Sequence, residues 1–122
     1  MTVDIEDYNR RWLQAWTDKD VPTLARMYGP NVVYRDAQIP NGVEGLPALT
    51  AYLERMFAAT PAIRYSPETV WPIPGGFCAR WYADMDHPNG PVRLRGFDMV
   101  LLEGDRIAFN EVYTHTMPPQ GA

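Results

Sequence analysis

Three segments in the first half of the chain carry hydrophobic residues at the spacing of an amphipathic α-helix. The first, residues 4–18, has acidic residues in its first turn and an apolar face that includes Tyr8, Trp12 and Trp16. The second is expected to begin after the capping residue Asp20 and to end at Gly29-Pro30. The third is predicted over residues 46–59. Its buried face should hold Leu49, Tyr52, Leu53, Met56 and Phe57.

Alternating hydrophobic and polar residues predict β-strands over most of the remaining chain. One strand is expected at 31–36 and another at 62–73, where Pro67 and Pro72 cannot donate ladder hydrogen bonds and so indicate an edge or a bulge. Three further strands follow. Helices first and strands last predict an α+β fold, in a single domain over 1–122 with a flexible tail from about residue 117.

The turn between the next two strands decides which side chains share a face. A two-residue turn at Asn89-Gly90 would place Trp81 opposite Asp98, on a face of small and apolar residues. The same register would form two opposite-charge pairs on the other face, Asp86 with Arg93 and Asp84 with Arg95. Arg80 also lies on that other face, so it is not expected to neutralise Asp98.

The last turn and the outer face of the sheet carry two further expectations. A turn at Gly104-Asp105 would place Glu111 opposite Asp98, whereas a three-residue turn or a bulge would place Asn110 there. The outer face would expose the apolar side chains of Phe97, Met99 and Leu101. A solitary sheet would leave this patch open to water, so we expect a homodimer.

Composition and charge narrow the range of partners. The chain has 122 residues, 46% hydrophobic, with 11 basic and 15 acidic side chains and no basic stripe. Nucleic acid and membranes are therefore not expected partners, and a small apolar molecule fits better. Without a secretion or transit pattern, the chain is predicted to be cytoplasmic. The single cysteine, Cys78, is interpreted as packing, and the scattered histidines, His87 and His115, predict no metal site; no cofactor motif occurs.

Four stretches resemble the SnoaL-like family of the nuclear-transport-factor-two-like superfamily. They are W-x3-W-x3-D at 12–20, LARMYGPNVVYRD at 24–36, VEGLPALTAYLERM at 43–56 and GFDMVLLEGDRIAFNEVY at 96–113. The superfamily includes ketosteroid isomerases, polyketide cyclases, limonene epoxide hydrolase and scytalone dehydratase. The resemblance implies a cone-shaped α+β barrel, in which a strongly curved mixed sheet wraps three helices around a deep apolar pocket. We expect that pocket to be lined by Trp12, Trp16, Tyr34, Tyr52, Trp81 and Asn110.

The same resemblance implies catalytic carboxyl groups. Asp36 resembles the proton-shuttling carboxylate of the isomerases, and Asp98 resembles their protonated, hydrogen-bond-donating aspartic acid. Trp12 stands where the isomerases have a tyrosine. Glu111 resembles one acid of the epoxide hydrolases, although no Arg-x-Asp precedes it in RWYAD. The single acid–base carboxylate of the cyclases could correspond to Asp36, Asp98 or Glu111.

These observations favour a cofactor-independent acid–base enzyme of the isomerase or cyclase type, acting on a small apolar molecule. Burial raises the pKa of a carboxyl group, and two neighbouring carboxyls separate into one acid and one base. On this hypothesis Asp98 stays protonated while Asp36 moves the proton. The alternatives are a non-catalytic ligand-binding or dimerisation module, or an epoxide hydrolase or dehydratase. In a purely structural role, Asp98 would accept from Trp81 or backbone N–H groups, and Asp36 would close a turn.

Overall fold

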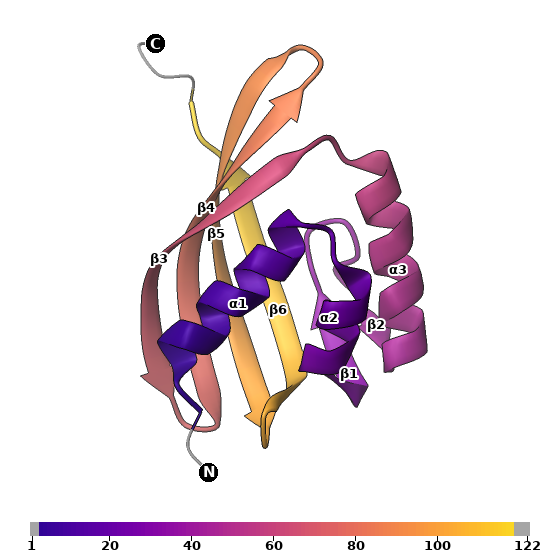
Figure 1. Cartoon of the computed structure of the whole chain (residues 1–122), viewed down its shortest axis with the longest axis vertical. Coiled ribbons are helices and arrows are strands. Elements are labelled where there is room, and N and C mark those ends of the chain that lie inside the picture. The colour runs from indigo at the N-terminus through magenta and orange to yellow at the C-terminus, as the bar shows by residue number, and fades with distance from the viewer. Residues whose placement is uncertain (1–2, 119–122) are drawn as a thin grey trace.

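The structure, a computed structural model, describes residues 3–118 as three helices packed on a six-stranded mixed sheet (Figure 1). In chain order the elements are α1 (Ile5–Thr17), α2 (Val21–Met27), β1 (Tyr28–Arg35), β2 (Val43–Glu44), α3 (Leu46–Ala59), β3 (Ile63–Ile73), β4 (Gly76–His87), β5 (Gly90–Glu103) and β6 (Arg106–Thr116). The strands lie in the order β2-β1-β6-β5-β4-β3, with β1 parallel to β6 and all other neighbours antiparallel. The predicted α+β class is confirmed, and the curved sheet remains open between its edge strands β2 and β3.

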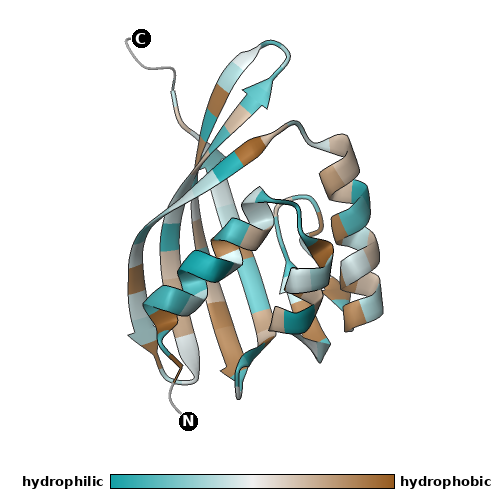
Figure 2. Ribbon diagram, in the orientation of Figure 1, coloured by the Kyte–Doolittle hydropathy of each residue, from teal (hydrophilic) through white to brown (hydrophobic). Residues whose placement is uncertain are grey.

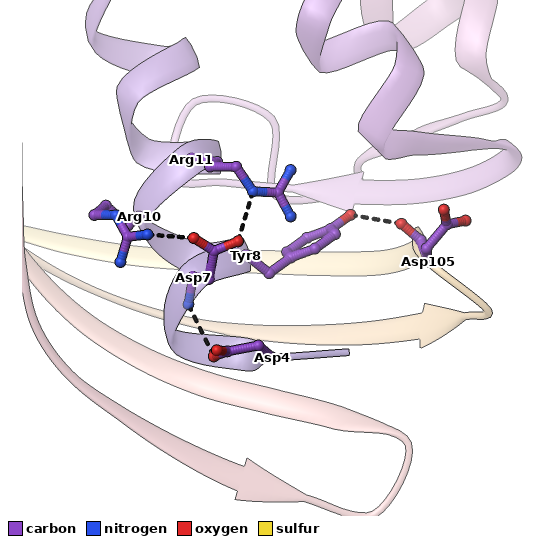
Figure 3. Close-up of polar contacts among 6 residues, drawn as sticks. All are labelled: Asp4, Asp7, Tyr8, Arg10, Arg11 and Asp105. Atoms are coloured by element: carbon purple, nitrogen blue, oxygen red, sulfur yellow. Dashed lines mark hydrogen bonds and ion pairs between the residues drawn. The ribbon is translucent and has the colours of Figure 1, made fainter. Parts of the chain in front are cut away.

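Helix α1 crosses the concave face of the sheet and is fastened at its N-terminal end (Figure 3). The Asp4 carboxylate accepts a hydrogen bond from the Asp7 backbone N–H at 3.1 Å, which caps the helix. The Asp7 carboxylate in turn accepts from Arg11 at 2.9 Å. The buried Tyr8, one helical turn after Asp4, donates a hydrogen bond from its hydroxyl to the carbonyl oxygen of Asp105, in the β5–β6 turn, at 3.1 Å. The sequence-distant turn therefore holds α1 against the sheet.

The other two helices follow their sequence signals. Asp20 caps α2 by accepting from the Thr23 backbone N–H at 3.1 Å, and α3 covers 46–59 as predicted. Strand β1 begins at Tyr28, three residues earlier than predicted, because Gly29-Pro30 belongs to the strand. Its pairing with β6 is irregular between Tyr28 and Val33, where Pro30 has no N–H to donate. The two-residue strand β2 lies in a segment expected to be loop, too short to show a periodic pattern.

Strand β3 is the edge strand that its prolines predict. It occupies one end of the sheet, and its pairing with β4 shifts between Pro67 and Thr69. The expectation of an edge or bulged position is therefore confirmed on both counts.

The predicted register of the β4–β5 hairpin is wrong by two residues. His87 pairs with Gly90, so Pro88 and Asn89 are the central turn residues. The proline ring fixes φ near the value that the first central position of a type I turn requires, and Gly90 follows with a φ of 117°. The chain therefore turns one residue before Asn89-Gly90.

The shift changes the partners across this hairpin but leaves the faces as predicted, because side chains alternate with a period of two. Trp81 lies opposite Gly96, and Asp98 lies opposite Ala79 on the same buried face. The predicted ion pairs do not form. The pairs that form on this face are Asp84 with Arg93 at 3.4 Å, Asp86 with Arg64 at 3.1 Å, and Arg80 with Glu68 at 2.7 Å.

The β5–β6 hairpin has the predicted turn but also a bulge. Glu103 pairs with Arg106 across Gly104-Asp105, and the register then shifts by one residue at Ala108. Asp98 consequently lies opposite Val112, and neither Glu111 nor Asn110 is its direct partner. The shift turns Asn110 toward the buried face and Glu111 toward the outer face.

The hydrophobic core fills the space between the helices and the concave face of the sheet. Figure 2 shows hydrophobic and hydrophilic positions interleaved along the long strands, as expected of a sheet with one buried face. Trp12, Tyr28 and Phe77 are among its most deeply buried side chains. At the start of the predicted tail, the Met117 backbone N–H donates to the Arg93 carbonyl at 2.8 Å; residues 119–122 lie outside the described part. Within the described residues, the helices are too short or too polar to cross a membrane.

Candidate active site

A cavity of about 200 Å³ lies between helices α1 and α3 and the concave face of the sheet. Six aromatic side chains line it: Trp12, Trp16, Tyr34, Phe57, Tyr65 and Trp81. Asp36 and Asp98 are its two carboxyl groups, and no lysine, arginine or histidine of the described residues lines it. Of the six predicted pocket residues, Tyr52 and Asn110 do not line the cavity. Tyr52 donates a hydrogen bond to Asp36, and Asn110 donates one to Asp98.

Phe57 and Tyr65 line the cavity but were not among the pocket residues expected from the sequence. Phe57 lies on the predicted buried face of α3. Tyr65 lies in β3, two residues from the buried Ile63 and therefore on the same face of the strand. The signal for both was present, but it marked burial and not contact with a cavity.

Asp98 is a buried carboxyl group with one unpartnered oxygen. Its side chain is 1% exposed, and its Oδ2 accepts a hydrogen bond from Asn110 Nδ2 at 3.1 Å. Its Oδ1 is buried without a hydrogen-bond partner. Burial raises the pKa of Asp98 to about 7, against smaller lowering effects of Asn110 and the Trp81 indole. The Trp81 N–H is near enough to act on this pKa but lies outside hydrogen-bond geometry.

Asn110 is held in one orientation by a buried network behind Asp98. The Tyr28 hydroxyl donates to Asn110 Oδ1 at 2.9 Å, and Asn110 Nδ2 also donates to the Met99 carbonyl at 3.2 Å. Both Tyr28 and Asn110 are fully buried, and burial raises the pKa of Tyr28 well above its ordinary value. The tyrosine therefore remains a donor, and the amide presents its N–H to Asp98.

Asp36, at the mouth of the cavity, uses both carboxylate oxygens in hydrogen bonds. Its Oδ2 accepts from the hydroxyls of Tyr34 at 2.8 Å and Tyr52 at 2.7 Å. Its Oδ1 accepts from the backbone N–H groups of Gln38 at 2.9 Å and Ile39 at 3.1 Å. Asp36 therefore closes the turn after β1, as its structural interpretation predicts.

Glu111 lies apart from Asp98, on the other face of β6. It pairs with Arg35 at 3.3 Å and accepts a hydrogen bond from the Tyr113 hydroxyl. The Tyr113 hydrogen bond, followed by Arg35, holds the pKa of Glu111 below its ordinary value. The prediction that Glu111 faces Asp98 is wrong, because the bulge at Ala108 inverts the faces of the residues that follow it.

Gly96 is required by the position of the Trp81 ring. A Cβ added at Gly96 would lie 2.2 Å from the nearest Trp81 ring atom, so Gly96→Ala must displace the indole. We expect the substitution to lower the free energy of unfolding by about 1–3 kcal/mol, measured by urea denaturation.

Gly29→Ala is the matched control, because its nearest obstacle is a backbone oxygen at 3.3 Å and its expected cost is smaller. In a double-mutant cycle, Trp81→Leu should make Gly96→Ala less costly. Additive effects in that cycle would show that the indole is not the obstacle.

Comparison with known proteins places this architecture in a family. The family model of the SnoaL-like domain matches residues 9–110. The chain belongs to the SnoaL-like family. The resemblance found in the sequence is thereby confirmed. A search of curated protein sequences finds no match to the chain.

Solved structures share the fold of this SnoaL-like chain at low sequence identity. A candidate polyketide cyclase from Acidithiobacillus ferrooxidans is 13% identical with a TM-score of 0.79, covering 93% of this chain and 91% of its own. An epoxide hydrolase from M. tuberculosis is 14% identical with a TM-score of 0.74, covering 89% and 80%. A protein with a ketosteroid isomerase-like fold from Catenulispora acidiphila, in complex with trimethylamine, is 15% identical with a TM-score of 0.77, covering 93% and 86%.

Proposed function

We propose that this SnoaL-like protein is a cofactor-independent acid–base enzyme, of the isomerase or cyclase type, that acts on a small apolar molecule. The observation that carries the proposal is Asp98, a carboxyl with one unpartnered oxygen in an aromatic cavity. Its pKa of about 7 means that both protonation states are populated at neutral pH. Such a group can give and take a proton efficiently.

Asp98 fits this role better than Asp36. A carboxylate has about four lone-pair positions, and Asp36 already accepts four hydrogen bonds. Asp98 accepts one hydrogen bond, from Asn110 on Oδ2, so its Oδ1 remains available to a ligand. We therefore assign both proton transfers to Asp98 and the shaping of the mouth to Asp36.

The reaction that this geometry supports needs no further reactant. Protonated Asp98 transfers its proton from Oδ1 to an oxygen of the substrate, such as a conjugated carbonyl, which leaves positive charge on the substrate. A proton on a neighbouring carbon then returns to Oδ1, and the electron pair of the broken C–H bond forms the new double bond. The substrate leaves as an isomer, and Asp98 regains its starting state.

Two comparisons bear on the alternatives. In the epoxide hydrolases that the sequence resembles, an arginine lies between two aspartates, whereas Arg80 of this chain points away from the cavity toward Glu68. This geometry gives epoxide hydrolysis less support. The trimethylamine complex of the Catenulispora protein supports a small-ligand cavity in this fold.

The test is a screen of ketones, enones and epoxides with the purified protein, followed by a pH profile of turnover. Because the protonated carboxyl starts the reaction, the turnover rate should be at its maximum below about pH 7 and should fall about tenfold per pH unit above it. An ordinary pKa at Asp98, with no turnover of any class, would contradict the proposal and favour a ligand-binding module.

We also infer a homodimer through the outer face of the sheet. Four large hydrophobic side chains are exposed there, at 40–62%: Trp71, Phe97, Met99 and Tyr113. Light scattering at micromolar concentration should give twice the chain mass of 13.9 kDa. Phe97→Glu should produce monomers, because it places a charge beside Trp71. Ala58→Glu, at an exposed position of α3, is the control and should leave the dimer intact. A monomeric wild-type protein would refute this inference.

A further inference from the structure

The walls of the cavity are suited to a positive charge. Trp16 contacts Phe57 with ring centroids 5.4 Å apart and an interplanar angle of 87°, and Tyr65 at 6.1 Å and 62°. Tyr65 contacts Trp81 at 5.0 Å and 65°. Trp16 and Tyr34 instead stack at 6.3 Å and 24°, so the aromatic walls that enclose the cavity stand at several inclinations. Aromatic faces carry partial negative charge, so such an enclosure attracts cations.

The cavity also contains a carboxyl without a counter-ion. Asp98 takes part in none of the ion pairs formed within residues 3–118. Several polar and titratable groups interact electrostatically with Asp98, and all of them are uncharged at neutral pH. They are Tyr28 of β1, Tyr65 of β3, Cys78 and Trp81 of β4, and Asn110 of β6. When Asp98 is ionised, its negative charge is therefore free to pair with a ligand.

Other classes of ligand use this cavity less completely. An anion would be repelled by Asp36 at the mouth and Asp98 within. A hydrocarbon would fill the aromatic wall but leave Asp98 Oδ1 buried and unpaired, which costs free energy. A small organic cation satisfies both the rings and the carboxylate.

We propose that the cavity binds a small organic cation, carried as a tertiary or quaternary ammonium group, with Asp98 as its counter-ion. Its volume of about 200 Å³ exceeds the ~30 Å³ of a water molecule several-fold, which leaves room for such a group. This inference rests on the cavity of the proposed function and adds a second class of ligand, which binds when Asp98 is ionised. A substrate that takes the proton of Asp98 becomes a cation facing a carboxylate, and a stable ammonium ion resembles that state.

The test compares choline and tetramethylammonium with the uncharged carbon analogue of choline, in which a tert-butyl group replaces the trimethylammonium group. Binding is measured by calorimetry and by the fluorescence of the cavity tryptophans. At about pH 8 choline should bind at least about tenfold tighter than its analogue. Below about pH 7 its affinity should fall about tenfold per pH unit, because protonated Asp98 is no counter-ion, while binding of the analogue should not weaken in this way.

Asp98→Asn should remove the preference for choline, whereas Asp84→Asn on the outer face should keep it. Equal affinity for choline and its analogue, a choline affinity independent of pH, or no binding of either cation at millimolar concentration would overturn the inference. If Asp98→Asn does not fold, the pH dependence of the wild-type protein decides. Turnover of a ketone without cation binding would refute this inference alone, and cation binding without turnover would refute the proposed activity alone.

Discussion

Asp98→Asn should lower turnover by about a hundredfold or more, as much as Asp98→Leu. The amide keeps the shape of the carboxyl and can accept from Asn110 as Asp98 Oδ2 does. It can neither give nor take a proton, however, and proton transfer is the proposed role of Oδ1. The measurement is steady-state kinetics on the substrate class that the screen identifies.

Two comparisons make this prediction specific. Asp84→Asn, in an outer-face ion pair with Arg93, should leave turnover unchanged. If Asp98→Asn retains most of the activity while Asp98→Leu does not, Asp98 acts only as a hydrogen-bond donor. A hundredfold loss in a well-folded Asp36→Asn would instead assign proton transfer to Asp36, as in the isomerases that the sequence resembles.

The stability of the protein should fall as the pH rises from about 4 to about 7, and Asp98 should cause that fall. The folded protein holds the Asp98 proton up to about pH 7, whereas the unfolded chain releases it near the ordinary value of 3.8. A raised carboxyl pKa therefore stabilises the folded state at low pH, and the contribution is lost as the pH approaches 7. The difference in pKa corresponds to about 4 kcal/mol of unfolding free energy.

Urea denaturation at a series of pH values measures this effect as the difference between wild type and Asp98→Asn. The variant has no titrating group at this position, so its curve should lack the fall. Glu111→Gln is a control of opposite sign, because the lowered pKa of Glu111 stabilises the folded state above the ordinary carboxyl pKa. Parallel curves for wild type and Asp98→Asn between about pH 4 and 7 would show that Asp98 titrates as an ordinary carboxyl.

The sequence by itself determined the elements whose signals are local. Helical periodicity with acidic residues in the first turn located α1, the cap at Asp20 located the start of α2, and periodicity alone gave the bounds of α3. Alternation also placed Trp81 and Asp98 on one buried face, and this survived a wrong register because a shift of two residues preserves the faces. The sequence also contains a signal for the correct turn, which the prediction at Asn89-Gly90 did not use, since Pro88 favours the first central position of a type I turn.

The tertiary structure alone decided the remaining features of the candidate site. No local pattern marks the bulge at Ala108, yet that one residue turns Asn110 toward Asp98 and Glu111 away from it. Asp36 is occupied partly by the hydroxyl of Tyr52, which comes from α3 and reaches it only through the packing of that helix on the sheet. Whether a carboxyl group can bind a ligand depends on how many hydrogen bonds it already accepts from residues distant in the sequence. The hydrophobic periodicity of the sequence indicates only which residues are buried.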